Sequence, residues 1–252
     1  MILEIDLSQS ALPLKPYHWS ELPNGPVIRE SVEQTLSPWW PRIFGYYLLS
    51  LGPLSHKMAK TGVGINRKYS LFDEAQADIE GDYCQLPIQN ASIDAVVMNF
   101  LLEFEADPYR LLREVDRVLI SGGHLVITGF NPLSPMFFGK MLPKHQQEIP
   151  WCGRFFMPSR VKDWLGLLGY QVVADERILH HHLLGDVKVG NIWSHALKSW
   201  LPSSGSVYVL VAKKLESPLT PIQVKRKVKR PNWSTAPSAS RTGHASKSSN
   251  EF

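Results

Sequence analysis

In the middle of the chain, two continuous apolar runs flank a segment whose apolar residues recur at helical spacing. The run at residues 95–100 is almost wholly apolar, which is typical of a strand buried on both faces of a sheet. The Asp-Pro pair at residues 107–108 then supplies a helix cap and a first-turn proline, and the glycine pair at residues 122–123 is predicted to end the helix. Residues 124–130 form a second apolar run, so this strand, helix, strand unit predicts a parallel sheet. The stripe of the helix consists of Leu111, Leu112, Val115, Val118 and Leu119.

The same two patterns recur more weakly on both sides of this unit. Helical spacing predicts one helix over residues 27–36 and another that begins at Pro158 and ends at Gly169. Short apolar or alternating runs predict additional strands. These strands are expected at residues 46–51, 63–66, 77–81, 171–174 and 206–213.

Composition shifts along the chain predict three regions. Prolines interrupt residues 1–42, which we interpret as a helical and irregular N-terminal cap. Residues 43–216 hold the alternating strands and helices of one α/β domain. From residue 217 to residue 252 Pro, Ser, Lys and Arg replace the apolar residues, which predicts a disordered basic tail.

The positive charge of the chain lies in that tail. The formal net charge is +4, and residues 217–252 hold seven basic side chains against one acidic one. The remaining 216 residues hold 20 basic and 22 acidic side chains, so the folded body is slightly acidic. A contact with RNA or another polyanion is therefore a hypothesis for residues 225–230 alone, where such runs are usually solvated.

Cysteine content and hydropathy indicate an intracellular, water-soluble protein. Cys84 and Cys152 are too few for a disulfide framework, and no signal peptide pattern opens the chain. The strongest apolar stretch, residues 43–54, is shorter than the roughly 20 residues that a membrane-spanning helix needs. We therefore expect a cytoplasmic protein with reduced thiols and no membrane span.

Several short motifs around the central unit occur in a fixed order and spacing. They are residues 81–88 (GDYCQLPI), 92–96 (SIDAV), 102–104 (LEF), 107–108 (DP) and 112–125 (LREVDRVLISGGHL). As a set they closely resemble the type-11 family of class I S-adenosylmethionine-dependent methyltransferases, and within it a YafS-like bacterial branch. The resemblance is dense over residues 81–130, weaker over 43–80 and 155–214, and absent from the tail.

The resemblance implies a Rossmann-like α/β fold. Its seven-stranded, mostly parallel sheet would carry helices on both faces and end in a reversed hairpin made by residues 171–174 and 206–213. It also implies S-adenosylmethionine as the cofactor and methyl transfer by direct displacement to an unidentified acceptor, for which a small molecule is the favoured class. Because such a displacement mainly needs alignment of the two reactants, the sequence names no catalytic residue.

The resemblance carries cofactor-binding roles onto five positions. Asp82 matches the acceptor of the adenine amine, although it could instead cap the turn that follows, and Tyr83 matches the neighbour along the ring. Asn99 matches the floor of the pocket, Gly52 matches a glycine after the first strand, and Asn66 matches the strand end that holds the ribose hydroxyls.

The glycine loop after the first strand departs from the family pattern. Ser50 stands where an acidic residue is usual, and Leu54 and His56 replace two further glycines, where they would crowd the cofactor. Asn66 offers a neutral acceptor where a carboxylate is usual, which predicts weaker cofactor binding. An alternative hypothesis is therefore a non-catalytic relative that uses the fold for binding or scaffolding.

One cluster of residue types suited to metal binding stands apart from these motifs. It consists of His180, His181 and His182 with Asp186. No second cluster at ligand spacing accompanies it, so we favour a surface or substrate-side role and assign no metal.

Overall fold

A computed structural model describes residues 15–73, 76–141, 147–179 and 205–215. All of these residues fall within one compact unit that runs from Met1 to Ser217. The predicted tail lies outside the described residues. Among the helices that are described, none is both long and apolar enough to cross a membrane.

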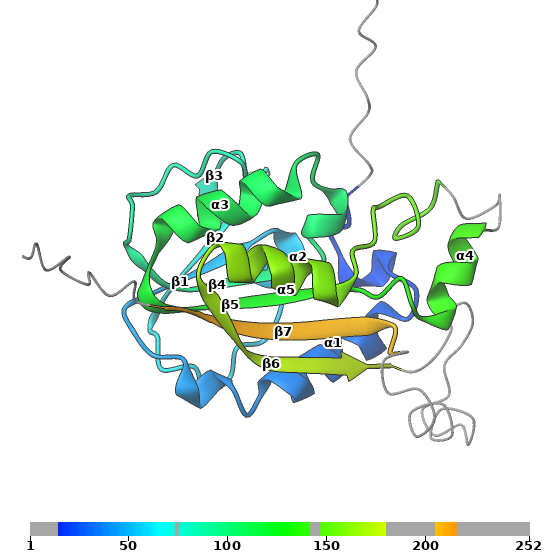
Figure 1. The fold of residues 1–252 in the computed structure, drawn as a ribbon, viewed down its shortest axis with the longest axis horizontal. Coiled ribbons are helices and arrows are strands. Elements are labelled where there is room, and N and C mark those ends of the chain that lie inside the picture. Colours follow the sequence, from blue (N-terminus) through cyan, green and yellow to red (C-terminus); the bar gives the residue numbers. More distant parts are fainter. Residues whose placement is uncertain (1–14, 74–75, 142–146, 180–204, 216–252) are drawn as a thin grey trace, which may run out of the picture. The chain divides into compact units, whose positions relative to one another are not determined.

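The described residues form one seven-stranded sheet with helices on both faces (Figure 1). The strands are β1 (Tyr47–Leu51), β2 (Arg67–Phe72), β3 (Ile79–Glu80), β4 (Ile93–Asn99), β5 (Leu119–Phe130), β6 (Tyr170–Ile178) and β7 (Val207–Lys214). The helices are α1 (Gly25–Leu36), α2 (Pro53–His56), α3 (Pro108–Val118), α4 (Phe138–Met141) and α5 (Pro158–Leu167). Single 3₁₀ turns are η1 (Trp19–Glu21), η2 (Trp40–Arg42), η3 (Leu102–Phe104) and η4 (Pro135–Phe137).

The strand order is β3-β2-β1-β4-β5-β7-β6, and the first five strands in this order are parallel. Strand β7 lies antiparallel between β5 and β6, so β6 and β7 form the reversed hairpin that the resemblance implied. Chain order reverses between β1 and β4. In a sheet of this kind ligands bind beyond the carboxyl ends of the strands at that reversal.

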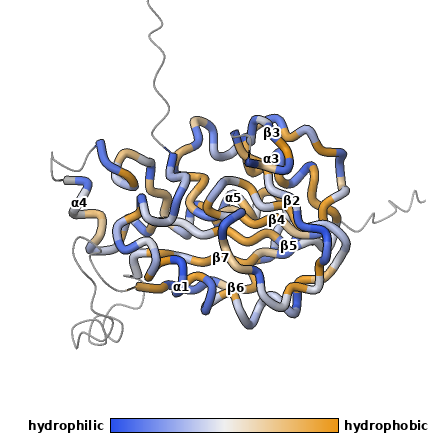
Figure 2. Tube along the Cα trace, turned by 180° about the vertical axis from the view of Figure 1, so that it is seen from behind, coloured by the Kyte–Doolittle hydropathy of each residue, from blue (hydrophilic) through white to orange (hydrophobic). Residues whose placement is uncertain are grey.

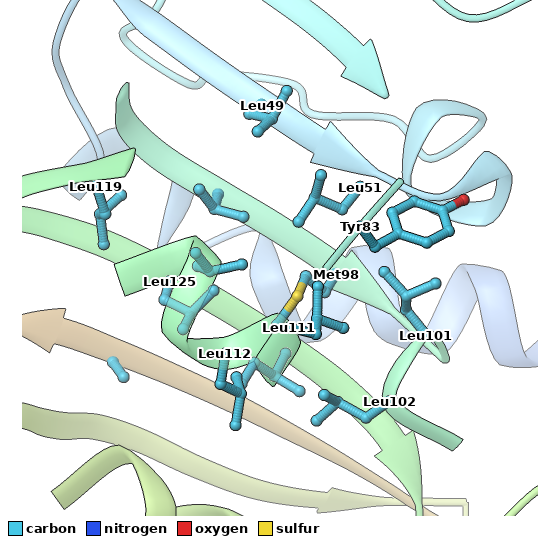
Figure 3. Packing of buried hydrophobic residues seen from close by; sticks show 14 of the residues in the cluster. Leu49, Leu51, Tyr83, Met98, Leu101, Leu102, Leu111, Leu112, Leu119 and Leu125 are labelled. Atoms are coloured by element: carbon cyan, nitrogen blue, oxygen red, sulfur yellow. The ribbon is translucent and has the colours of Figure 1, made fainter. Parts of the chain in front are cut away.

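Two apolar layers hold the helices to the sheet, and the strands are the most hydrophobic part of the trace in Figure 2. On one face α3 and α5 pack on alternate strand residues such as Leu49 and Met98 (Figure 3). On the other face α1 packs on Val207, Val209 and Val211 of β7. Because neighbouring strand residues point to opposite faces, Leu48 and Leu49 of β1 belong to different layers.

Helix α3 begins where the sequence predicted and ends earlier. The Asp107 side chain accepts a hydrogen bond from the Arg110 backbone N–H at 3.0 Å, and Pro108 occupies the first turn. The prediction that the glycine pair ends the helix is wrong, because the residue after Val118 is already extended. That residue, Leu119, pairs with Ile93 of β4, so strand pairing ends the helix.

The predicted strand at residues 63–66 is also wrong. In this stretch Gly64 makes an isolated bridge to Phe44, and the ladder with β1 begins at Arg67. The first three residues of β2 are exposed and the last three are buried. The apolar pattern of β2 is therefore short, which is why sequence periodicity placed the strand four residues too early.

Candidate functional site

The carboxyl ends of β1 and β4 meet at a narrow pocket. Its empty volume is about 280 Å³, and Gly52, Asp73, Tyr83 and Asn99 are among the residues that line it. A more open pocket of about 620 Å³ adjoins it and shares Asp73 and Tyr83. The narrow pocket lies at the reversal of strand order, where a ligand is expected, and the open pocket lies beside it at the ends of β2 and β3.

A larger pocket of about 1050 Å³ lies elsewhere, against the face of β1 and β2. Its lining is mostly apolar, and its charged residue is Asp78. The Asp78 carboxylate accepts bonds from the Ser70 N–H and hydroxyl, both at 2.7 Å, and these bonds lower its pKa. Since this carboxylate is already held by the fold, the pocket at the strand ends is the better candidate for chemistry.

Gly52 shapes the turn at the end of β1. Its backbone has a φ of 83° and a ψ of 156°, a region that residues with a Cβ scarcely adopt. The turn leads directly into α2, whose Pro53 and Leu54 also line the narrow pocket. Leu54, which the sequence predicts to crowd the cofactor, therefore lines this pocket, whereas His56 is exposed and lies beside the Phe72 ring.

Asp73 is the acidic residue at the end of β2, and the sequence analysis missed it. Asn66 was assigned that place, yet Asn66 precedes the amino end of β2 and is exposed. The two ends of a six-residue strand lie at opposite edges of the sheet, so Asn66 is not brought together with Gly52. The Asp-Glu pair that follows the apolar pair Leu71–Phe72 is the signal that could have located Asp73.

Asp82 and Tyr83 follow β3 and face the same region. The Tyr83 ring is buried beside Leu101 (Figure 3). Asp82 is exposed, and its Oδ1 accepts a hydrogen bond from the Cys84 backbone N–H at 2.8 Å. Asp82 therefore does cap a turn, while its exposed carboxylate still borders the open pocket.

An ion pair on α3 fixes the loop that carries these two residues. Arg117 donates to Glu114 Oε2 at 2.8 Å and to the carbonyls of Leu86 and Ile88, each at 2.9 Å. Glu114 in turn accepts from the Leu86 N–H at 3.0 Å. The bonds from Arg117 lower the pKa of Glu114, and the pair ties residues 81–92 to α3. The family motif on α3 thus positions the pocket rather than contacting a ligand.

Asn99 lines the pocket, but its side chain is committed to the protein interior. It is 2% exposed, its Oδ1 accepts from the Thr128 hydroxyl at 2.9 Å, and its Nδ2 lies 3.3 Å from Met58 Sδ. Its backbone N–H donates to the Ser55 hydroxyl at 2.8 Å. These contacts join β4 to β5 and to α2, so they explain why a polar residue is tolerated there.

Residues 15–17, which we call the N-terminal strap, cross this region. Lys15 Nζ donates to Glu105 Oε1 at 2.7 Å and lies 4.7 Å from the centre of the Tyr83 ring. The Tyr17 hydroxyl donates to Asp73 Oδ1 at 3.1 Å. Figure 1 shows this start of the described chain (dark blue) beside the segment between β4 and α3. Sequence patterns gave no indication of these contacts.

The groups at the strand ends fit an adenosyl cofactor. Asp73 offers charged oxygens at the end of β2 for hydroxyl groups, and Asp82 offers them for an amine. Gly52 allows the backbone to approach closely. Cys84 lies next to the pocket, but burial and the nearby Glu105 raise the pKa of its thiol to about 11, which makes it a poor nucleophile. The predicted cluster at residues 180–186 lies outside the described residues.

The sheet order and this edge site define the Rossmann-like fold of class I methyltransferases. The family profile of the methyltransferase domain matches residues 49–127. The uncharacterized protein YafS of Escherichia coli (strain K12) is 33% identical over 227 residues, which cover 90% of this chain and 92% of the relative. The chain therefore belongs to the S-adenosylmethionine-dependent methyltransferase family, in its YafS branch.

Other similar proteins agree with this assignment. A demethylmenaquinone methyltransferase of Chlamydia pneumoniae is 28% identical over 130 residues, 44% of this chain and 56% of the relative. A solved methyltransferase of Listeria monocytogenes, described as S-adenosylmethionine-dependent, has a TM-score of 0.53 at 12% identity over 76% of this chain and 100% of its own. Geranyl diphosphate methyltransferase in complex with the cofactor has a TM-score of 0.52 at 14% identity over 75% and 85% of the two chains. At these identities the structures show the shared fold.

Proposed function

We propose that the protein binds S-adenosylmethionine at the ends of β1 to β4 and transfers its methyl group to a small molecule. The main observation that supports this proposal is that Gly52, Asp73 and Tyr83 line one pocket at the reversal of strand order. Asp73 would accept from the ribose hydroxyls and Asp82 from the adenine amine, while Tyr83 would lie along the adenine ring.

The chain's own contribution to transfer would be alignment and exclusion of water. The bound cofactor supplies an electrophilic methyl group on a cationic sulfur. Leu54, Phe100 and Leu101 line the inner pocket with apolar surface that keeps water away from the reacting atoms. Because positioning alone lowers the barrier of a direct displacement, no acid or base residue is assigned.

A small molecule is the proposed acceptor class because a related protein is named for one. The Chlamydia pneumoniae relative is a demethylmenaquinone methyltransferase, and its similarity covers 130 residues of the two chains. The narrow pocket at the strand ends is lined mostly by apolar and aromatic side chains, with Asp73 and Asn99 among its polar groups. Such a lining suits a small ligand.

Calorimetric titration of the full chain with S-adenosylmethionine and with its demethylated product tests the proposal. Asp73→Asn keeps the shape of the side chain and removes its charge, so we expect about ten- to hundredfold weaker binding. Asp163→Asn, at an exposed position of α5, is the matched control and should bind as the parent does. Equal affinity of the two variants would contradict the role of Asp73.

The same titration separates the enzyme from the non-catalytic alternative. Absence of heat with both compounds, in the parent and in the double variant Lys15→Ala, Tyr17→Phe of the N-terminal strap, would refute cofactor binding. If binding is found, methyl transfer can be followed with isotopically labelled cofactor against a panel of small acceptors.

A further inference from the structure

We infer that the N-terminal strap is an autoinhibitory contact that occupies the cofactor's place and must leave before the cofactor binds. This inference rests on the proposed function, because it concerns the same site. The strap is formed by Lys15, Pro16 and Tyr17, and all three residues line the narrow pocket.

The first argument is that Tyr17 uses the carboxylate that the ribose would need. Its hydroxyl donates to Asp73 Oδ1 at 3.1 Å, as a ribose hydroxyl would. Lys57 Nζ donates to the Tyr17 carbonyl at 3.0 Å and so fixes the strap from the side of α2. A ribose and Tyr17 therefore compete for one acceptor.

The second argument is that Lys15 covers the aromatic ring and neutralises a buried acid. Its ammonium lies 4.7 Å from the centre of the Tyr83 ring, on the surface where an adenine would lie. It also pairs with Glu105 at 2.7 Å, and the side chains of Lys15 and Glu105 are 17% and 7% exposed. A charge-assisted bond with so little solvent contact is among the stronger side-chain contacts.

The third argument is the space that remains. With the strap in place the inner pocket leaves only about 10 Å³ that a water-sized sphere can reach, far below the roughly 300–1,000 Å³ typical of ligand pockets. Lys15, Asp73 and Tyr83 line both this pocket and the open one of about 620 Å³. The strap thus divides one potential cavity into two.

The pocket can open by displacement of the few residues of the strap. Trp19 of η1 is 6% exposed and packs edge-on against Phe100 at 5.8 Å, so the chain is anchored immediately after the strap. Release of the strap's bonds to Asp73, Glu105 and Lys57 would join the two pockets while η1 and α1 remain in place. The strap therefore lowers the apparent affinity for the cofactor by the fraction of molecules that are closed.

Calorimetry on a released strap tests this inference. The double variant Lys15→Ala, Tyr17→Phe keeps an aromatic ring at residue 17 and removes the side-chain bonds to Glu105 and Asp73. We expect it to bind S-adenosylmethionine about tenfold more tightly than the parent. The matched control is Lys162→Ala, Tyr46→Phe, which removes an ion pair to Asp175 and an exposed hydroxyl away from the site. The control should bind as the parent does.

Each outcome decides between the two proposals. Equal or weaker binding by the strap variant than by the control would overturn autoinhibition, because a strap that closes over the bound cofactor gives that result, and the proposed function would stand. Binding by the strap variant alone, or tighter binding by it, supports both. Failure of every chain to bind would overturn both.

Hydrogen exchange on the unmutated chain is a second test of the autoinhibitory strap. If the strap competes with the cofactor, S-adenosylmethionine will accelerate amide exchange at Lys15, Tyr17 and His18. Slower exchange at these amides on cofactor addition would contradict the inference even if the double variant failed to fold.

Discussion

The carboxyl edge of the sheet holds polar side chains of two kinds. At β2, Asp73 is exposed, and its partner belongs to a strap that packs from outside. At β4 and the turn after it, Asn99 and Glu103 are buried, and their partners are the Thr128 hydroxyl and the Phe130 N–H of β5. On the β2 side the acceptor is bound by a strap at the surface, and on the β4 side the acceptors hold neighbouring strands together.

This difference shows that a polar residue at a strand end is weak evidence for a ligand site unless its burial and partners are known. A buried donor that loses its partner costs about 1–3 kcal/mol, whereas an exposed one is satisfied by water. Substitutions on the β4–β5 side should therefore change stability, and substitutions on the β1–β2 side should change binding.

The largest expected effect is at Glu103. This side chain is fully buried, and its Oε1 accepts the Phe130 N–H at 2.8 Å. Glu103→Ala leaves that N–H without its acceptor and opens a cavity, so the free energy of unfolding should fall by about 3 kcal/mol. Urea titration followed by circular dichroism measures it. A loss smaller than that of the exposed Asp163→Ala control would break the comparison.

The same residue predicts a pH dependence. Burial raises the pKa of Glu103 from 4.5 to about 7, although the bond from Phe130 opposes the shift. Between these two pH values the unfolded chain releases the proton and the folded chain keeps it. Stability should therefore fall as pH rises from 4.5 to about 7, by about 3 kcal/mol, and level off above. Glu103→Gln, which cannot titrate, should flatten this part of the curve.

Asn99 should give a smaller effect of the same kind. Asn99→Ala removes the acceptor of Thr128, which predicts a loss of about 1–2 kcal/mol in the free energy of unfolding. Thr128→Val removes the same bond from the other side and should match it in chemical denaturation. Affinity for S-adenosylmethionine should stay within about threefold of the parent. A large loss of affinity at unchanged stability would instead favour the pocket-floor role that the sequence suggested.

The unit β4-α3-β5 was predictable because its signals are local. Its strands contain apolar runs, and the Asp107 cap and the apolar stripe of α3 can be recognised without any distant partner. Its helix end was not predictable, because pairing of Leu119 with Ile93 outweighs the glycine pair. Strand β2 was misplaced because its exposed half carries no apolar pattern.

The part of the site that could be predicted also depends on local sequence signals. Gly52 and Tyr83 lie at the pocket, as their motifs implied, and Asp73 was missed together with the end of β2. The strap could not be found from local patterns, because Tyr17 contacts a residue 56 positions away and Lys15 one 90 positions away. Contacts at such separations follow from the assembled sheet.

The smallest expected effect decides between the two roles that the sequence left open for Asp82. Its exposed carboxylate caps the Cys84 N–H, so Asp82→Ala should lower stability by no more than about 1 kcal/mol. If the carboxylate also accepts from adenine, the same variant should bind the cofactor about tenfold more weakly. Asp82→Asn keeps a capping oxygen and loses the charge, so it should restore stability while binding remains weak. Unchanged affinity in both variants would leave Asp82 with the turn alone, and Asp73 would then be the acidic ligand of this half of the edge.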